Sequence, residues 1–270
     1  MNKKEREFQG FILDWYEKCG RHELPWRQTQ DPYVVLVSEL MLQQTQVARV
    51  IPKFAVFVEK YPTVQQLARA SLGDVLRLWQ GLGYNRRAKF LLQCAQTLVG
   101  EHDGVFPVHY DELLKLPGIG PYTAAAICAF AYNQPVELIE TNVRQVYIHH
   151  FFKNKESVTD KEILERVRRT LPESQSRQWY AALMDYGTHL KSQHGNNTQR
   201  SKAYKKQSKF KGSNREVRAA IVRELTVTPL SKLQLCEHLD TYEATKIQPQ
   251  LAALLTEQLV VCIEGKYQLP

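Results

Sequence analysis

Apolar residues repeat at helical spacing along most of this chain. One such stripe runs from Phe8 to Trp15 and ends near Cys19, and residues 33–61 have the pattern of two helices divided around residues 46–51. The same spacing predicts helices over 74–78, 87–99, 110–115, 122–131, 161–171 and 178–190. No strand-like alternation stands out before residue 225. The sequence therefore predicts a mainly α fold.

The last part of the chain has a different pattern. Three helices are predicted over 217–225, 230–239 and 244–255, and two short segments, 258–264 and 266–269, are split by Gly265 like the strands of a β-hairpin. Three helices followed by a terminal hairpin are the outline of a winged helix. We therefore expect a small C-terminal winged-helix-like α+β domain.

Basic residues favour a polyanionic partner. The formal net charge is +8, and eight basic residues but a single acidic one lie between residues 199 and 218. We expect four lysines of this basic arm to contact DNA phosphates: Lys202, Lys205, Lys206 and Lys209. The alternative is a solvated basic linker.

The spacing of the cysteines and the length of the apolar runs argue against disulfide-linked, membrane-spanning and secreted proteins. The five cysteines lie far apart, form no C-x-x-C pair and are expected to be free thiols. No apolar run approaches the roughly 20 residues of a membrane span, and no long apolar stretch follows the basic N-terminus. We therefore expect a protein without a membrane partner that works in the cytoplasm.

A tight turn separates two of the predicted helices. In Leu116-Pro117-Gly118-Ile119-Gly120, the glycines permit positive φ and a close approach of the backbone to a ligand. The helix that follows presents its first N–H groups and the positive end of its dipole, which suits a phosphate. We expect DNA phosphate contacts at Gly118, Ile119, Gly120 and Thr123. The alternative is a plain turn between two helices.

Several motifs in a fixed order resemble the adenine DNA glycosylase (MutY) family, within the helix-hairpin-helix, or endonuclease III, superfamily. Beside the hairpin they are Leu13-Asp14-Trp15-Tyr16, Leu24-Pro25-Trp26-Arg27, the run from Ser38 to Val47, Trp79-Gln80-Gly81-Leu82-Gly83-Tyr84 and Leu183-Met184-Asp185-Tyr186-Gly187. The resemblance covers roughly residues 8 to 190. It implies two all-α domains with a cleft that receives a flipped base.

The resemblance also implies domain boundaries. A six-helix barrel with the hairpin is expected over 25–131, and a second helical domain over 1–24 and 132–198. A basic linker, 199–213, and the winged-helix-like domain, 214–270, complete the chain.

Two carboxyls suffice for base excision, since one protonates the leaving base and the other stabilises the positive charge on the sugar or activates water. Glu39 matches the family's glutamate and lies in an apolar helix, where burial would raise its pKa. Glu140 stands where the family has aspartate, and its extra methylene moves the oxygens by about an ångström. Either the pocket compensates or the activity is altered. Asn142 matches the family asparagine and is expected to orient a carboxylate or the attacking water.

Other motif residues receive roles from the resemblance. Superfamily members with lyase activity carry a lysine where this chain has Tyr122, and tyrosine cannot form a Schiff base, so hydrolysis without strand cleavage is expected. Tyr122 is expected to line the base pocket with Trp26 and Arg27. The residues expected to insert into the duplex or lie near the orphaned base are Gln43, Gln44 and Tyr84. For Tyr84 and Trp26, ordinary core packing is the alternative.

Three departures limit what the resemblance implies. Residues 191–209 contain no cysteine where the family has a four-cysteine iron–sulfur loop, so no cluster is expected, and the hairpin could hold a monovalent cation at most. Ala181 stands where the family has a Gln or Glu that reads adenine. The family's 8-oxoguanine-recognition domain is replaced by the shorter terminal domain.

The expected function is that of a monofunctional DNA glycosylase, a monomer acting on double-stranded DNA that contains a mismatch or damaged base. The simplest target is adenine opposite guanine or 8-oxoguanine. One alternative is a glycosylase for thymine or uracil mispaired with guanine, or for another lesion. A second is a non-catalytic DNA-binding protein that uses the winged helix.

Overall fold

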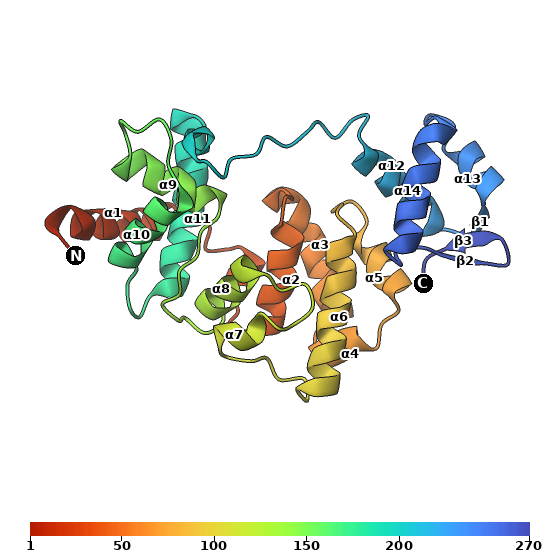
Figure 1. Cartoon of the computed structure of the whole chain (residues 1–270). Coiled ribbons are helices and arrows are strands. Elements are labelled where there is room, and N and C mark those ends of the chain that lie inside the picture. Colours follow the sequence, from red (N-terminus) through yellow and green to blue (C-terminus); the bar gives the residue numbers. More distant parts are fainter. The chain divides into compact units, whose positions relative to one another are not determined.

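The computed structural model describes all residues from 1 to 270, and the chain is mostly helical (Figure 1). The helices of the first 200 residues are α1 (Lys3–Cys19), η1 (Pro25–Arg27), α2 (Pro32–Leu42), α3 (Val47–Lys60), α4 (Val64–Ala68), α5 (Leu72–Trp79), α6 (Arg86–Glu101), α7 (Tyr110–Leu113), α8 (Pro121–Phe130), α9 (Thr141–Phe151), α10 (Asp160–Thr170), α11 (Ser176–His194) and η2 (Asn197–Arg200). No helix combines the length and apolar character that crossing a bilayer requires. The mainly α prediction is confirmed.

The chain divides into two compact units. Unit 1 comprises residues 1–36, 107–115 and 119–206, and unit 2 comprises residues 37–106, 116–118 and 207–270. This division differs from the predicted boundaries, because most of the hairpin region groups with the N-terminal helix and the terminal domain groups with α3 to α6. The boundaries at 25–131, 132–198 and 199–213 stay a prediction.

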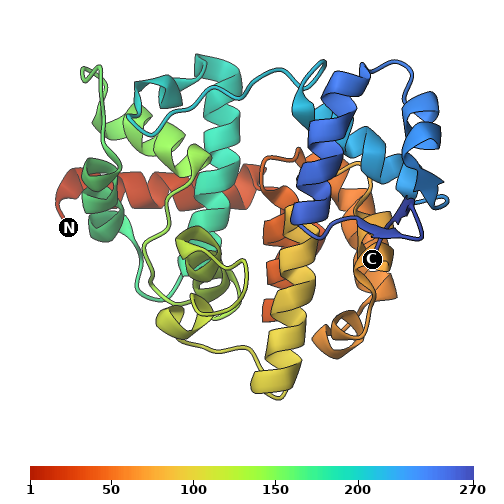
Figure 2. The same ribbon diagram turned by 45° about the vertical axis from the view of Figure 1, so that its right-hand side comes forward.

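Unit 1 has an aromatic-rich core where α1 crosses α11 (Figure 2). The ring of Phe8 packs edge-on against Tyr147 and Trp179, with centroids 5.5 and 5.8 Å away. On α11, Gly187 faces Asn142, and a Cβ at Gly187 would lie only 2.6 Å from the Cβ of Asn142. A glycine at this position therefore lets α11 pack closely against the first turn of α9.

Unit 2 combines α3–α6 with the C-terminal part of the chain. The latter contains α12 (Asn214–Leu225), β1 (Leu230–Ser231), α13 (Lys232–His238), α14 (Ala244–Thr256), β2 (Val261–Ile263) and β3 (Lys266–Gln268). The three short strands form an antiparallel sheet in the order β1-β3-β2. Three helices with this sheet confirm the winged-helix-like prediction.

The terminal domain is bonded to α5 and α6. The N–H of Gly73 donates to the carbonyl oxygen of Pro270 at 2.7 Å, and Lys89 Nζ donates to that of Glu257 at 2.8 Å. Arg77 Nε donates to the carbonyl oxygen of Thr226 at 3.3 Å. These contacts attach the terminal domain to α5 and α6.

Several local predictions were wrong. The break after α2 covers residues 43–46 rather than 46–51, because Gln46 is the N-cap of α3. Helices α4 and α9 were not predicted from the sequence. Leu230 belongs to a strand rather than a helix, since Ser231 caps α13 with its side chain.

Candidate functional site

The hairpin between α7 and α8 has the geometry that its glycines predict. Gly118 has a φ of 74°, and a Cβ there would collide with the Cβ of Phe90. Gly120 is the N-cap of α8, with no side chain to cap the helix, and Pro121 takes the first helical position. Ile119 and Thr123 are buried. An anion at this turn would therefore be bound by the backbone.

Glu39 is a buried carboxyl in the middle of α2. Glu39 is only 6% exposed, and its helix neighbours Leu36, Leu40 and Met41 are buried as well. The burial expected from its apolar surroundings is confirmed. Glu39 is therefore not a surface glutamate.

Glu140 is the N-cap of α9. Its Oε1 accepts a hydrogen bond of 2.8 Å from the backbone N–H of Val143, and its Oε2 accepts one of 3.3 Å from Asn142 Nδ2. Burial raises the pKa of Glu140, although hydrogen bonds from the backbone N–H groups of α9 and the charge of Arg144 oppose the rise. Glu140 thus has a fixed orientation, and Asn142 contacts it directly.

Tyr122 lines a cavity of about 700 Å³ in unit 1. The other lining residues are mainly apolar: Tyr110, Pro121, Ala125, Val136, Glu137, Leu138, Ile139 and Leu164. Four of them, residues 136–139, immediately precede Glu140 in the chain. The cavity therefore lies next to the segment that ends at the proposed charge-stabilising carboxylate. Trp26 and Arg27 do not line it.

Arg27 is bound to a carboxylate within the protein. Its Nη1 and Nη2 donate to the two oxygens of Asp185 at 2.5 and 2.8 Å, and its guanidinium lies 5.6 Å from the ring centroid of Tyr16. Arg21 Nε donates to Asp185 at 2.8 Å. Burial acts to raise the pKa of Asp185, but the hydrogen bonds from Arg27 and Arg21 outweigh it and lower the pKa. These contacts give Arg27 a structural role.

Gln44 and Tyr84 are at the tips of two neighbouring loops. Both have left-handed backbones, with φ of 56° and 48°, a strained conformation for residues with a Cβ. Thr45 Oγ1 donates to the carbonyl oxygen of Leu82 at 3.2 Å and so joins the loops. Gln44 and Tyr84, two of the three residues expected to meet the duplex, are therefore held side by side.

Buried Arg87 holds both loops in place, and the sequence reasoning missed it. Its Nη1 donates to the carbonyl oxygens of Leu40 and Gln43 at 2.6 Å each, and its Nη2 to those of Leu82 and Gly83 at 3.0 and 2.9 Å. Burial lowers its pKa to about 10. The signal was available, because Arg87 stands on the same helical face as the apolar Leu91, Cys94 and Leu98 of α6.

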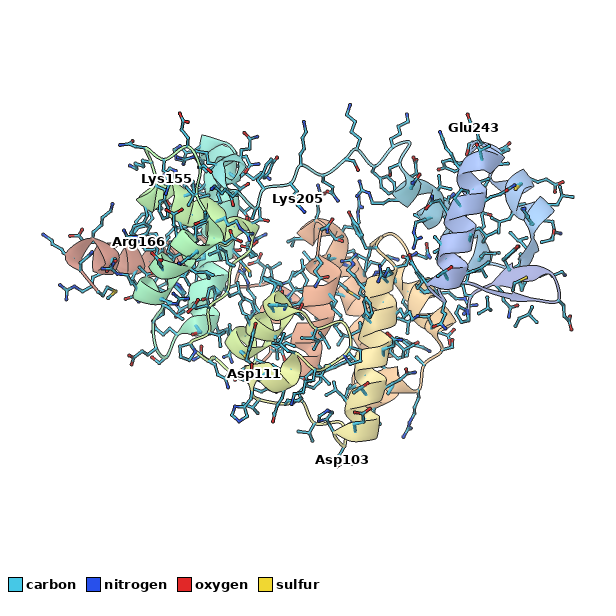
Figure 3. The ribbon with its side chains drawn as sticks, in the orientation of Figure 1. Asp103, Asp111, Lys155, Arg166, Lys205 and Glu243 are labelled. Carbon is cyan, nitrogen blue, oxygen red and sulfur yellow. The ribbon has the colours of Figure 1, made fainter.

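A short helix, η2, directly precedes the exposed lysines of the basic arm. Arg200 donates to the carbonyl oxygens of Phe152 and Lys153, just beyond α9, so this basic residue is used within the protein. The four lysines of the arm are exposed and form no ion pair: Lys202, Lys205, Lys206 and Lys209. Figure 3 labels Lys205 on this irregular segment between η2 and α12.

Comparison with known families identifies one match. The model of the HhH-GPD superfamily, described as base excision DNA repair proteins, matches residues 37–173. Curated relatives named adenine DNA glycosylase include those of Buchnera aphidicola subsp. Baizongia pistaciae, 36% identical over 67% of this chain and 52% of the relative, and Mycolicibacterium smegmatis, 42% identical over 65% and 60%. The human relative of that name is 43% identical over 52% of this chain and 27% of its own. The chain thus spans about half the length of the curated relatives it matches.

Solved structures share the fold. A thermostable thymine-DNA glycosylase superposes with a TM-score of 0.66 and 26% identity, over 73% of this chain and 92% of the other. An endonuclease III in a non-covalent complex with DNA superposes with a TM-score of 0.57 and 21% identity, over 70% and 86%.

Proposed function

The chain belongs to the HhH-GPD superfamily of base excision DNA repair proteins, and on that premise we propose that it is a monofunctional DNA glycosylase. It binds duplex DNA, flips out one base and hydrolyses the bond between that base and its sugar. The target is adenine opposite guanine or 8-oxoguanine, which the names of the curated relatives support. The observation that carries the proposal is the pair of specialised carboxyls, Glu39 inside a helix and Glu140 at a helix N-terminus.

The two carboxyls have different tasks in this mechanism. Glu39 donates a proton to the leaving base, so that the base departs neutral rather than as a poor anionic leaving group. Glu140 stays ionised and stabilises the positive charge that develops on the sugar. Its bonds to Val143 and Asn142 fix the direction of the carboxylate, and we propose that this compensates for a side chain longer than aspartate.

Burial at Glu140 has a consequence for the pH dependence. A raised pKa means that Glu140 gains its proton at a higher pH than an exposed glutamate does. Because the protonated form cannot stabilise a cation, base release should fall on the acid side of neutrality before an ordinary glutamate would titrate. The pH profile of single-turnover base release measures this limb.

The central test is Glu39→Gln. We expect single-turnover base release to fall by about a hundredfold or more, while duplex affinity changes little, because a general acid acts in the transition state. Exposed Glu59 on α3 provides a matched control, Glu59→Gln, which should keep the wild-type rate. The assay uses duplexes with each mismatch and common lesion, followed by alkali cleavage of abasic sites. A wild-type rate in Glu39→Gln would remove Glu39 from the mechanism.

Tyr122 supports hydrolysis without lyase activity. A phenol cannot form a Schiff base with the abasic sugar, so strand cleavage should require added alkali or heat. Borohydride should trap no covalent adduct with DNA. A trapped adduct would assign the nucleophile to a lysine elsewhere in the chain.

DNA backbone contacts are assigned to the hairpin and the basic arm. If the four arm lysines bind phosphates, replacing all of them with alanine should weaken binding to every duplex alike. The slope of log affinity against log salt should flatten by about 0.9 for each phosphate that the variant no longer neutralises. An unchanged slope would leave the arm as a tether.

A thymine or uracil mismatch glycosylase is the second candidate. Two observations favour it: Ala181 provides no side-chain hydrogen bond for reading adenine, and the thymine-DNA glycosylase superposes over most of its length. The mismatch panel separates the two, since release of thymine or uracil opposite guanine with adenine untouched would select this candidate.

The same proposal covers the oligomeric state, the location and the cofactors of the enzyme. The enzyme acts as a monomer with the chromosome in the cytoplasm and needs no iron–sulfur cluster, because residues 191–209 offer no cysteine ligand. A monovalent cation at the hairpin is compatible with the proposed mechanism.

A further inference from the structure

Two residues beyond the helical core contact the loop tips: Gln207 contacts both Gln44 and Tyr84, and Arg215 contacts Tyr84. Gln207 Nε2 donates to Tyr84 Oη at 2.5 Å and to Gln44 Oε1 at 3.1 Å. Arg215 Nη1 donates to Tyr84 Oη at 2.7 Å, and its guanidinium lies 5.6 Å from the Tyr84 ring centroid. All four residues belong to unit 2. The segment that follows the helical core therefore continues the surface formed by the two loops.

The position of Arg215 is fixed from several sides. It lies in the first turn of α12, and its Nη2 donates to the carbonyl oxygen of Ser208 at 2.7 Å. Its guanidinium also lies 6.0 Å from the ring centroid of Phe210. Since the terminal domain is bonded to α5 and α6 through Gly73 and Lys89, Arg215 is held over Tyr84 by the fold as well as by its own hydrogen bonds.

The two loops that Gln207 and Arg215 contact have a backbone conformation typical of binding sites. Gln44 and Tyr84 both have strained left-handed backbones, and the buried guanidinium of Arg87 holds their loops together. Such strain persists where the surroundings enforce it, and it concentrates at functional sites. Gln207 is exposed and Arg215 is half-buried, so both side chains remain within reach of a molecule that approaches these loops.

We infer that Gln207 and Arg215 are specificity-determining residues that read the base left opposite the flipped one. The inference rests on the proposed function and on the family resemblance, which implies that Gln44 and Tyr84 insert into the duplex or lie near that base. An arginine fork is suited to the O6 acceptor of a guanine-type purine, whereas cytosine and adenine present an amino donor at the corresponding position of the base edge. The Gln207 amide has both a donor and an acceptor and can pair with guanine N7 or with the N–H that replaces it in 8-oxoguanine.

This role differs from that of the arm lysines. A lysine that binds a phosphate raises the affinity for all duplexes, because the phosphate is the same in every sequence. A residue that reads a base edge changes the ratio of affinities between duplexes. The two roles can therefore be separated within one segment of chain.

The experiment measures equilibrium binding of the full chain to duplexes that carry a tetrahydrofuran abasic analogue. The analogue is placed opposite guanine, 8-oxoguanine, cytosine or thymine. Because binding needs no base release, the result can be read even if the proposed adenine excision fails in the mismatch panel. We expect the wild type to prefer the two guanine-type partners. Gln207→Ala and Arg215→Ala should each reduce that preference by about tenfold.

Two further variants keep the inference falsifiable. Arg215→Lys keeps the charge and most of the side chain but lacks the planar fork, so it should lose preference without unfolding. Lys209→Ala removes a charge from an exposed, unpaired residue of the same segment, and it should lower all four affinities by one common factor. Equal losses on all four duplexes in the Gln207 and Arg215 variants would overturn the inference. An increase in all four affinities would also overturn it, because the segment would then be an obstacle to the duplex.

Discussion

Each of the two units contains an arginine with little solvent exposure, and the two arginines are neutralised differently. In unit 1, Arg27 is paired with Asp185, whose other partner is Arg21. In unit 2, Arg87 has no carboxylate and donates to backbone carbonyl oxygens and to Thr45 Oγ1. The first site balances charge with charge, whereas the second spreads one positive charge over the dipoles of several peptide groups.

The difference explains what each arginine fixes. The Arg27–Asp185 pair joins two distant parts of the sequence, η1 and α11, and so stabilises the fold of unit 1. Arg87 joins two loops whose tips, Gln44 and Tyr84, have strained backbones. A carboxylate would satisfy the charge at one point, but only a fork of donors can bind carbonyls of both loops at once. We infer that Arg27 serves mainly stability and Arg87 mainly the shape of the candidate site.

The largest effect is expected from Asp185→Ala. It leaves Arg27, whose side chain is 12% exposed, without its counter-ion, and breaking a pair with so little solvent exposure costs about 3–5 kcal/mol. Urea unfolding measures the decrease in stability. The matched control is Asp160→Ala, whose pair with Arg144 is more exposed and should cost about 1 kcal/mol. Equal decreases in the two variants would mean that burial does not distinguish the pairs.

The same pair predicts a pH dependence. The folded-state pKa of Asp185 lies below its unfolded value, so its contribution to stability is present above the unfolded pKa of about 4 and is lost as the pH falls through the folded value. The wild type should therefore lose more stability than Asp185→Asn on acidification below about pH 5. Parallel acid unfolding curves for the two proteins would contradict the assignment.

Arg87→Lys should have the second largest effect. Lysine offers three donors, fewer than Arg87 uses on the carbonyls of both loops, so buried carbonyl oxygens are left unsatisfied at a cost of about 2 kcal/mol. Base release should fall as well, because the loop tips lose their common support. The neighbouring Arg86 is exposed, and Arg86→Lys should change neither quantity. Full activity in Arg87→Lys would show that the loops keep their shape without the fork.

The two arginines also show which parts of the structure could be predicted from the sequence. Burial of Glu39 and the conformation of Gly118 followed from local patterns: apolar neighbours at helical spacing and a turn that only glycine accommodates. The partner of Arg27, Asp185, lies 158 positions away in the sequence, and no local pattern indicates that the two residues pair. The resemblance therefore implied a base-pocket role for Arg27, whereas its contacts indicate a structural one. Arg87 could have been found as a lone charge in an apolar stripe. Gln207 could not, because its contacts depend on how a segment without regular structure lies over unit 2.

The smallest effect is expected from Arg21→Gln. Arg21 contributes a second set of hydrogen bonds to Asp185, but its side chain is 33% exposed and that of Arg27 only 12%. Removing the guanidinium leaves Asp185 paired with Arg27 and with the backbone N–H of Arg21, at 2.8 Å, so the carboxylate stays neutralised and bonded. Solvent can also replace part of the missing interaction, which limits the cost to about 1 kcal/mol. Exposed Arg6 on α1 provides the control, and Arg6→Gln should leave the free energy of unfolding unchanged. A destabilisation in Arg21→Gln as large as in Asp185→Ala would mean that both arginines are needed to neutralise one carboxylate.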